Sequence, residues 1–304
     1  MRFFQNAQSK GVNSFLSFIL SLLLIFGFYI VTSMPFGLYA MIQGIGGEEV
    51  SSYHGPVGFA LVLFVFSGIL FGVIFATRWI HKRPIISVFS GAASFRWNRL
   101  VGASAIWAGI LVILELVSFL YEPHNYSFQF DPGPFFMVLL VAILVLPLQT
   151  TAEELFMRGY LMQQLGLVAN KPWIPVLVSS VLFGLLHAAN PEIDQYGMAK
   201  AMTLYIGMGL FFGIVTVMDD GLEMPIGMHY INNFFAFIIV GYKGSVMEGL
   251  PSIFVKESED LSWAAVITNL IIMALVLLLL KRYFNWPSFN QLLKNIRASE
   301  SSVN

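Results

Sequence analysis

Long apolar runs with almost no charge dominate this chain. Eight of them approach the roughly 20 residues that a helix needs to cross a hydrocarbon core of about 30 Å. They lie at residues 12–32, 57–77, 100–120, 134–152, 173–191, 201–218, 224–242 and 263–280. Only 11% of the residues are charged and 57% are hydrophobic. The sequence therefore predicts an all-α fold, a polytopic transmembrane helical bundle of about eight spans.

The apolar runs and their short connections occupy nearly the whole chain. No remaining stretch is large enough for a separate soluble domain, so residues 1–304 are expected to form a single membrane-embedded domain. The first run follows Arg2 and Lys10 but is longer than the apolar part of a typical secretory signal and lacks a clear cleavage site. We expect it to be a retained first helix.

Basic residues predict the orientation, because Lys and Arg near the membrane ends of short loops favour the cytoplasmic side. An internal N-terminus would put thirteen of them inside: Arg2, Lys10, Arg78, Lys82, Arg83, Arg96, Arg99, Arg158, Lys171, Lys281, Arg282, Lys294 and Arg297. It would put three outside, namely Lys200, Lys243 and Lys256. We therefore expect both termini to be cytoplasmic.

Charge and cysteine content exclude several classes of function. The net charge is -1 and no basic stripe is available for phosphates, which gives no support for nucleic-acid binding. The chain has no cysteine, so disulfides, thiol catalysis and thiolate metal sites are excluded. Any catalytic chemistry must come from the few polar residues inside the spans.

Two adjacent glutamates, Glu153 and Glu154, directly follow the charge-free run 134–152. Ionisable groups at membrane depth are disfavoured unless they pair or line a water-filled cavity, so they indicate a functional site. Arg158 lies four residues after Glu154, in the order that suits a salt bridge on one helix face. Glu153 is rotated by about 100° around the helix, which predicts that it is free for chemistry. An ion cluster without a catalytic role is the alternative.

Two of the five histidines lie in apolar runs, each with a partner one helical turn away. Phe183 precedes His187 and Asn233 follows His229, a spacing of four residues that places each pair on one helix face. A lone intramembrane histidine is more often a buried hydrogen-bonding residue than a catalytic one. Because polar side chains in a membrane bundle turn inward together, we expect both histidines and Asn233 to converge with Glu153 on one cavity.

Three motifs thus follow one another on three hydrophobic helices: Glu153-Glu154-x-x-x-Arg158, Phe183-x-x-x-His187 and His229-x-x-x-Asn233. In this combination the chain resembles the CAAX protease and bacteriocin-processing family, also called CPBP or Abi, which includes the type II CAAX prenyl endopeptidase. The resemblance covers roughly residues 134–242, the expected catalytic core, whereas the other spans are similar only in hydropathy. Asn232 leaves a choice at the last position, and the spacing favours its neighbour.

The resemblance implies an intramembrane endopeptidase, a hydrolase that cleaves peptide bonds with a glutamate-activated water. Glu153 would take a proton from a water held between it and His187. His229 and Asn233 would donate hydrogen bonds to the oxyanion, a role in which losing one donor costs about 2.7 to 4 kcal/mol. The ion pair formed by Glu154 would hold the helix end in place.

A zinc-dependent metalloendopeptidase is an alternative mechanism for the same hydrolysis of peptide bonds. Glu153, His187 and His229 could supply three ligands and leave a fourth position open. The chain lacks the His-Glu-x-x-His arrangement that places two ligands on one helix. Ligand count alone does not decide, and we expect catalysis without a metal or another cofactor.

Two other classes of function fit the same residues. Intramembrane Glu, His and Arg also serve proton-coupled transporters, although no internal repeat of the kind common in transporters is visible. A non-catalytic membrane scaffold or immunity factor could bind a partner through the same cavity. The expected partners are a peptide or protein substrate, possibly lipidated, and membrane lipid. The expected location is a bacterial plasma membrane, with the active site toward the cytoplasmic leaflet.

Small residues and a proline bear on how the helices pack. Gly68 with Gly72 and Gly209 with Gly213 form small-xxx-small pairs that allow close helix approach. Packing within one bundle is the preferred interpretation, and dimerisation is the alternative. Pro147, two turns before the glutamates, predicts a kink.

An acidic connection precedes the run that contains His229. Asp219, Asp220 and Glu223 lie there within five residues. Such a connection is usually a solvated turn. Exposed carboxylates at this point could favour basic peptides as substrates.

Overall fold

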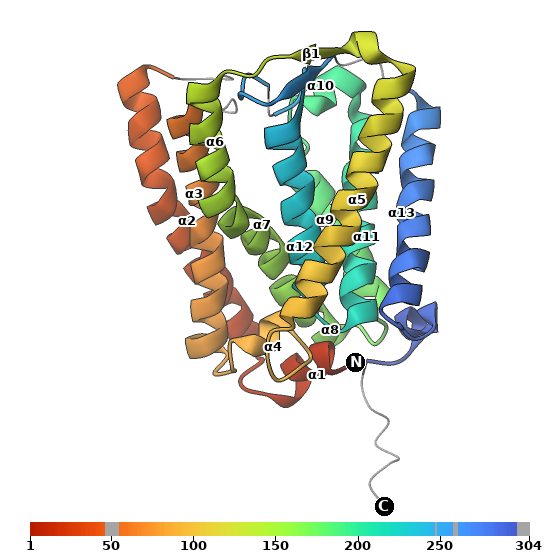
Figure 1. Cartoon of the computed structure of the whole chain (residues 1–304). Coiled ribbons are helices and arrows are strands. Elements are labelled where there is room, and N and C mark those ends of the chain that lie inside the picture. The colour runs from red at the N-terminus through yellow and green to blue at the C-terminus, as the bar shows by residue number, and fades with distance from the viewer. Residues whose placement is uncertain (46–54, 247, 258–260, 297–304) are drawn as a thin grey trace, which may run out of the picture.

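A computed structural model describes residues 1–45, 55–246, 248–257 and 261–296. Arg297, one of the basic residues assigned to the inside, lies outside this part. Long helices stand side by side, and the short helix α1 lies across one end of them (Figure 1). The predicted all-α bundle of apolar helices is confirmed.

The helices of the described part follow one another closely along the chain. They are α1 (Arg2–Ser9), α2 (Phe15–Gln43), α3 (Gly55–Phe75), η2 (Ala76–Ile80), α4 (Ile86–Phe89), α5 (Trp97–Tyr121), η3 (Pro123–Asn125), α6 (Pro132–Leu144), α7 (Leu146–Glu154), η4 (Leu155–Leu161), α8 (Met162–Val168), α9 (Trp173–Leu186), α10 (Glu192–Tyr196), α11 (Met198–Asp219), α12 (Glu223–Phe234), η5 (Phe235–Ile239), α13 (Trp263–Tyr283) and η6 (Phe289–Leu293). The segments η2, η4 and η5 are π-helical, whereas η3 and η6 are 3-10 helices.

Each of the eight predicted runs is largely helical. The prediction that His187 lies on a helix was wrong, because α9 ends at Leu186, and residues 240–242 at the end of the seventh run are extended. Within the described residues, six helical segments are long and apolar enough to cross a membrane: Phe15–Gln43, Gly55–Ile80, Trp97–Tyr121, Pro132–Val168, Met198–Asp219 and Trp263–Tyr283. The other two runs form α9, with 14 residues, and α12 with η5, which are shorter than a typical span. The number of eight spans and the cytoplasmic termini remain predictions.

The segment that carries the glutamates is bent and longer than expected. α6 ends at Leu144, and α7 begins directly after Val145 with Pro147 in its first turn. Figure 1 shows α7 running obliquely after α6, which confirms the predicted kink. The predicted end of this span at residue 152 was wrong, because the helical segment continues to Val168.

Both glycine pairs lie where two helices approach closely. A Cβ added to Gly72 of α3 would lie 2.7 Å from the Ile25 Cα of α2. A Cβ added to Gly209 of α11 would lie 2.8 Å from the Ser180 Cα of α9. The other glycine of each pair faces the same neighbouring helix. The predicted packing of these glycines within one bundle is confirmed.

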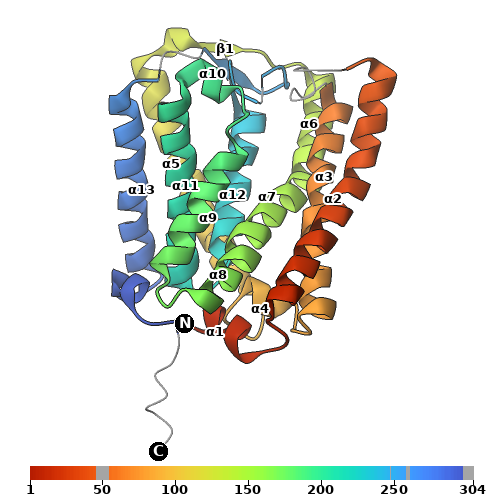
Figure 2. The same cartoon turned by 180° about the vertical axis from the view of Figure 1, so that it is seen from behind.

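A small sheet lies across the end of the bundle opposite α1 (Figures 1 and 2). Its strands are β1 (Tyr126–Phe128), β3 (Phe254–Lys256) and β2 (Val240–Tyr242), in that order, with β3 antiparallel to β1 and parallel to β2. Glu115 of α5 accepts hydrogen bonds from the hydroxyls of Tyr126 and Tyr242, the latter at 2.9 Å. These hydrogen bonds attach strands β1 and β2 to the long helix α5.

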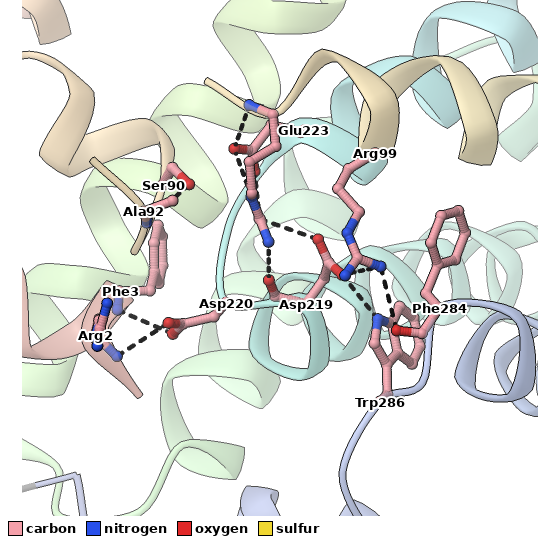
Figure 3. A network of polar contacts seen from close by, with 11 residues as sticks. Arg2, Phe3, Ser90, Ala92, Arg99, Asp219, Asp220, Glu223, Phe284 and Trp286 are labelled. Carbon is pink, nitrogen blue, oxygen red and sulfur yellow. Dashed lines mark hydrogen bonds and ion pairs between the residues drawn. The ribbon is translucent and has the colours of Figure 1, made fainter. Parts of the chain in front are cut away.

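The acidic connection before α12 is an ion-paired structure (Figure 3). Arg96 lies between two carboxylates: its guanidinium donates to Glu223 at 2.9 and 2.6 Å and lies 3.0 Å from Asp219. Asp219 also accepts from the indole N–H of Trp286 at 2.8 Å. Both carboxylates are buried. The expected solvated turn was wrong, because these charges are satisfied inside the protein and are not displayed to basic peptides.

Asp220 fixes the first helix to the same connection. Its carboxylate accepts from the backbone N–H groups of Arg2 and Phe3 at 3.1 and 3.0 Å (Figure 3). A negative charge is stabilised at a helix N-terminus by unpaired N–H groups and the helix dipole. Asp220 itself has a positive φ of 57° and ends α11. The connection between α11 and α12 is therefore held by the N-terminal helix and by Arg96, which directly precedes α5.

His81 follows η2 and is completely buried. Its Nδ1 lies 2.7 Å from the carbonyl oxygen of Val12, so that nitrogen must donate. The Nε2 then accepts from the Tyr160 hydroxyl at 3.1 Å. The Ser21 hydroxyl lies at the same distance and donates to the Ser17 carbonyl. Burial lowers the pKa of His81; the hydrogen bond to Val12 opposes this shift and the charge of Arg83 adds to it.

We predict that Gly72→Ala lowers the free energy of unfolding by about 1 to 3 kcal/mol, because the new methyl group pushes α3 away from α2. Thermal unfolding in detergent measures the effect. Gly109→Ala in α5 is the matched control, since nothing lies within 4 Å of a Cβ added there and alanine is the better helix former. Equal unfolding midpoints for the two variants would contradict the close contact.

We predict that the protein loses stability as the pH falls below about 6.5, where His81 of the unfolded chain becomes protonated. The folded state holds this imidazole neutral to a lower pH, so its contribution is complete above that value and is lost on acidification. His81→Gln cannot be protonated and should lose less of its unfolding midpoint between about pH 7.5 and about pH 5.5. An identical pH dependence in both proteins would argue against this role.

Candidate active site

Two helices that contact each other, α7 and α12, carry most of the predicted catalytic residues. Glu153 and Glu154 end α7, and the π-helix η4 follows directly. His229 and Asn233 lie one turn apart on α12. π-helical turns inside α-helical segments are frequent at functional sites.

Glu154 and Arg158 form the predicted salt bridge deep in the protein. The Arg158 Nη1 donates to the Glu154 Oε1 at 2.9 Å, and both side chains are 0% exposed. The Nδ1 of His229 lies 2.8 Å from the same carboxylate oxygen. A carboxylate can only accept, so this ring nitrogen carries a proton. Glu154 therefore joins the glutamate helix to the histidine helix.

Aromatic rings and a backbone carbonyl surround the Arg158 guanidinium. Its Cζ lies 4.4 Å from the ring centre of Phe183 and 5.7 Å from that of Phe212. Its Nη2 donates to the carbonyl of Gly209 at 3.5 Å. Phe212 also stacks on the imidazole of His229, with the ring centres 5.4 Å apart. α9 and α11 thus complete the surroundings of the ion pair, and the phenylalanine of the second motif covers the arginine of the first.

Glu153 is less buried than its neighbour, with 14% of its side chain exposed. Its Oε1 accepts a hydrogen bond from the Gln149 Nε2 at 2.6 Å. Its Oε2 lies 3.6 Å from the His229 Nε2, which is too long for a hydrogen bond. The imidazole of His229 therefore lies between two carboxylates, bonded to one and close to the other.

Asn233 reaches the glutamates through Gln149. Its Nδ2 donates to the Gln149 Oε1 at 3.5 Å. Asn232 donates to the Asn233 Oδ1 at 3.3 Å, which orients the Asn233 carboxamide. Of the two adjacent asparagines, Asn233 is the one that faces α7, as the motif spacing predicts.

His187 stands apart from this cluster. Its Nδ1 lies 2.7 Å from the carbonyl oxygen of Phe183, so this nitrogen donates and the neutral ring keeps its lone pair on Nε2. Its ring stacks on Tyr205 at 4.5 Å and packs against Phe183 at 4.5 Å. In the described part of the chain, no hydrogen bond or ion pair joins His187 to Glu153. The Phe183 ring contacts both imidazoles, since its centre lies 6.4 Å from that of His229.

The donors expected for zinc are not arranged as a metal site. Among the described residues, no group of three His, Cys, Asp or Glu side chains is placed to hold a metal ion. His229 directs its two ring nitrogens toward two different carboxylates, and His187 uses Nδ1 on a backbone carbonyl. As they stand, Glu153, His187 and His229 do not fit a shared metal ion, and the arrangement gives no support to a metalloendopeptidase.

Two cavities of about 420 and 500 Å³ lie near the ends of the bundle. The first borders Arg96 and Asp219, and the second borders Tyr242 and Pro134. Neither is lined by a predicted catalytic residue. The site is thus defined by contacts between side chains.

Sequence reasoning missed three residues of the site. Helical spacing could have predicted Gln149, because it lies one helical turn before Glu153. Phe212 and Tyr205 carried no comparable signal, since aromatic residues are frequent throughout the apolar runs. Their role depends on how α11 packs against α9, which the sequence pattern alone does not specify.

Comparison with known proteins identifies the family. Residues 132–235 match the sequence profile described as Rce1-like, type II CAAX prenyl endopeptidase Rce1-like. The uncharacterized protein YyaK of Bacillus subtilis (strain 168) is 33% identical over 198 residues, which cover 65% of this chain and 66% of that protein, slightly less than two thirds of its length. No solved structure matches the chain. Through its domain at residues 132–235, the chain belongs to the Rce1-like family of type II CAAX prenyl endopeptidases.

Proposed function

We propose that this protein is an intramembrane endopeptidase that hydrolyses peptide bonds with a water molecule activated by Glu153. The observation that carries the proposal is the cluster of Glu153, His229 and Asn233 on two helices. Gln149 bonds Glu153 and Asn233, and the His229 Nε2 lies 3.6 Å from the Glu153 Oε2. Membership of a family of prenyl endopeptidases supports the same conclusion. Such a concentration of polar groups within apolar helices indicates function.

Glu153 acts as the general base in this mechanism. Its Oε1 is held by Gln149, and its Oε2 is free to accept a proton from a water molecule. The hydroxide that forms attacks the carbonyl carbon of the scissile bond and gives a tetrahedral intermediate. When the C–N bond breaks, the protonated Glu153 returns the proton to the leaving amine, so one water is consumed for each bond cleaved.

His229 and Asn233 stabilise the oxyanion of that intermediate. Asn233 offers the amide hydrogen that is not bonded to Gln149. His229 donates through Nε2, which requires protons on both ring nitrogens because Nδ1 already donates to Glu154. Each donor is expected to contribute about 2.7 to 4 kcal/mol of transition-state stabilisation.

His187 orients the attacking water. Its Nδ1 donates to the backbone, so its Nε2 can accept a hydrogen bond from a water molecule. Stacking on Tyr205 and Phe183 holds the ring in place.

The proposed substrate is a peptide or protein, which is lipidated if it follows the prenyl endopeptidases that give the family its name. The enzyme is an integral membrane protein, and we propose that its active site faces the cytoplasmic leaflet of a bacterial plasma membrane. The basic residues counted in the sequence support this orientation. A scaffold, an immunity factor or a proton-coupled transporter would use the same polar groups without cleaving peptides.

We predict that Glu153→Gln abolishes cleavage and leaves the fold intact, because the amide has nearly the same shape but cannot take a proton. The assay uses purified protein in liposomes and a panel of quenched-fluorescent peptides, with and without a farnesylated C-terminal cysteine. Wild type should cleave at least one peptide, and it should do so equally in EDTA, because no step above requires a metal.

Glu115→Gln is the matched control, since Glu115 is an acidic side chain inside a span and, among the residues that the structure describes, bonds the sheet tyrosines and no predicted catalytic residue. It should cleave at the wild-type rate. Cleavage by Glu153→Gln at the wild-type rate would refute the general base. Loss of cleavage in EDTA that is restored by zinc would favour the metal-dependent alternative.

We predict that Arg158→Leu destabilises the fold by about 3 to 5 kcal/mol, because it leaves the buried Glu154 carboxylate without its partner. The double variant Glu154→Gln with Arg158→Leu should recover part of that stability, since it removes both charges. Thermal unfolding midpoints in detergent measure both effects. A single variant as stable as wild type would show that the ion pair does not support the bundle.

A further inference from the structure

We propose that Gln149 is a positioning residue that fixes the general base and the oxyanion donor relative to each other. This inference rests on the proposed function. One carboxamide spans the two groups: its Nε2 lies 2.6 Å from the Glu153 Oε1, and its Oε1 lies 3.5 Å from the Asn233 Nδ2. No other side chain in the described part of the chain bonds both residues.

The chemistry of the two contacts determines the direction of the amide. A carboxylate can only accept, so the NH2 of Gln149 must face Glu153. The carbonyl oxygen of Gln149 then faces Asn233, which donates its NH2. Reversing the amide would place two acceptors against each other at 2.6 Å and two donors against each other on the other side. Among uncharged side chains of this length, only glutamine donates in one direction and accepts in the other.

The link leaves on each partner the atom that the reaction needs. Asn233 uses one amide hydrogen on Gln149, and its Oδ1 accepts from Asn232 at 3.3 Å. Its second amide hydrogen remains for the oxyanion. Glu153 uses Oε1 on Gln149 and keeps Oε2 for the water. Gln149 therefore sets the spacing between the atom that takes the proton and the atom that donates to the oxyanion.

Burial restricts the Gln149 side chain. Gln149 is only 7% exposed and lies on α7 one turn before Glu153, so its own helix aims it at the base. Catalytic groups must keep their relative geometry closely, and small misplacements cost on the order of 100-fold in rate. Gln149→Leu keeps the volume and removes both hydrogen bonds. Gln149→Glu keeps the acceptor for Asn233 but places a second carboxylate against Glu153.

The test is a double-mutant cycle on the peptide that wild type cleaves fastest in the panel described above. It compares wild type, Gln149→Leu, Asn233→Ala and the double variant. We expect Gln149→Leu to lower kcat about 10- to 100-fold with KM unchanged within about twofold, because positioning acts on the transition state. The double variant should be little slower than the slower single variant, since both changes break one link.

Gln164→Leu is the matched control. Gln164 lies on the same helical segment, is 8% exposed, and its Nε2 has no hydrogen-bond partner among the described residues. It should keep the wild-type kcat. If Gln149→Leu does not fold, Gln149→Glu takes its place in the cycle with the same expected fall in kcat.

The unfolding midpoints of the same four proteins measure the coupling between Gln149 and Asn233 without depending on cleavage. Coupled effects on kcat with unchanged KM support the proposal. Independent effects whose factors multiply, or a Gln149→Leu that raises only KM, overturn it. If wild type cleaves no peptide, the proposed function fails; non-additive midpoints would still support the link between the two residues, and additive midpoints would reject it.

Discussion

A fully buried ion pair between Glu154 and Arg158 is the interaction on which the rest of the site depends. Removing two charges from water costs several kcal/mol for each ion, and only good geometry with further hydrogen bonds offsets that cost. Here His229 donates to the carboxylate, while Phe183 and Phe212 cover the guanidinium. These partners lie on α9, α11 and α12. Satisfying one pair of charges therefore brings together four helical segments.

The same pair orients the group proposed to bind the oxyanion. His229 is fixed at Nδ1 by Glu154, so its Nε2 is directed toward Glu153. Arg96, which lies earlier in the sequence, holds the acidic connection that precedes α12. The helix is thus anchored at its beginning and again at its histidine. Gln149 adds a third link at Asn233, so α12 is bonded to α7 at His229 and at Asn233.

Sequence patterns were most reliable where one helix decided the outcome. The Glu154–Arg158 pair, the kink near Pro147 and the close approach at Gly72 and Gly209 all follow from spacing along a single helix. Predictions were weaker where several segments meet. The acidic connection was expected to be solvated, but it is buried because Arg96 and Trp286, far away in the sequence, supply its partners. The small sheet also depends on β1 meeting β2 and β3, which lie more than 100 residues later in the sequence, and no periodicity marks it.

The sequence by itself determined the class of fold, the helices that carry polar groups, and the set of residues expected to meet, because hydrophobic length and helical periodicity are local properties. Only the tertiary structure decided how those residues are arranged relative to one another. It placed His229 between two glutamates, connected Asn233 to Glu153 through Gln149, and left His187 on Phe183 and Tyr205. Those choices depend on distances between helices, which are set by packing of side chains that the linear pattern does not pair.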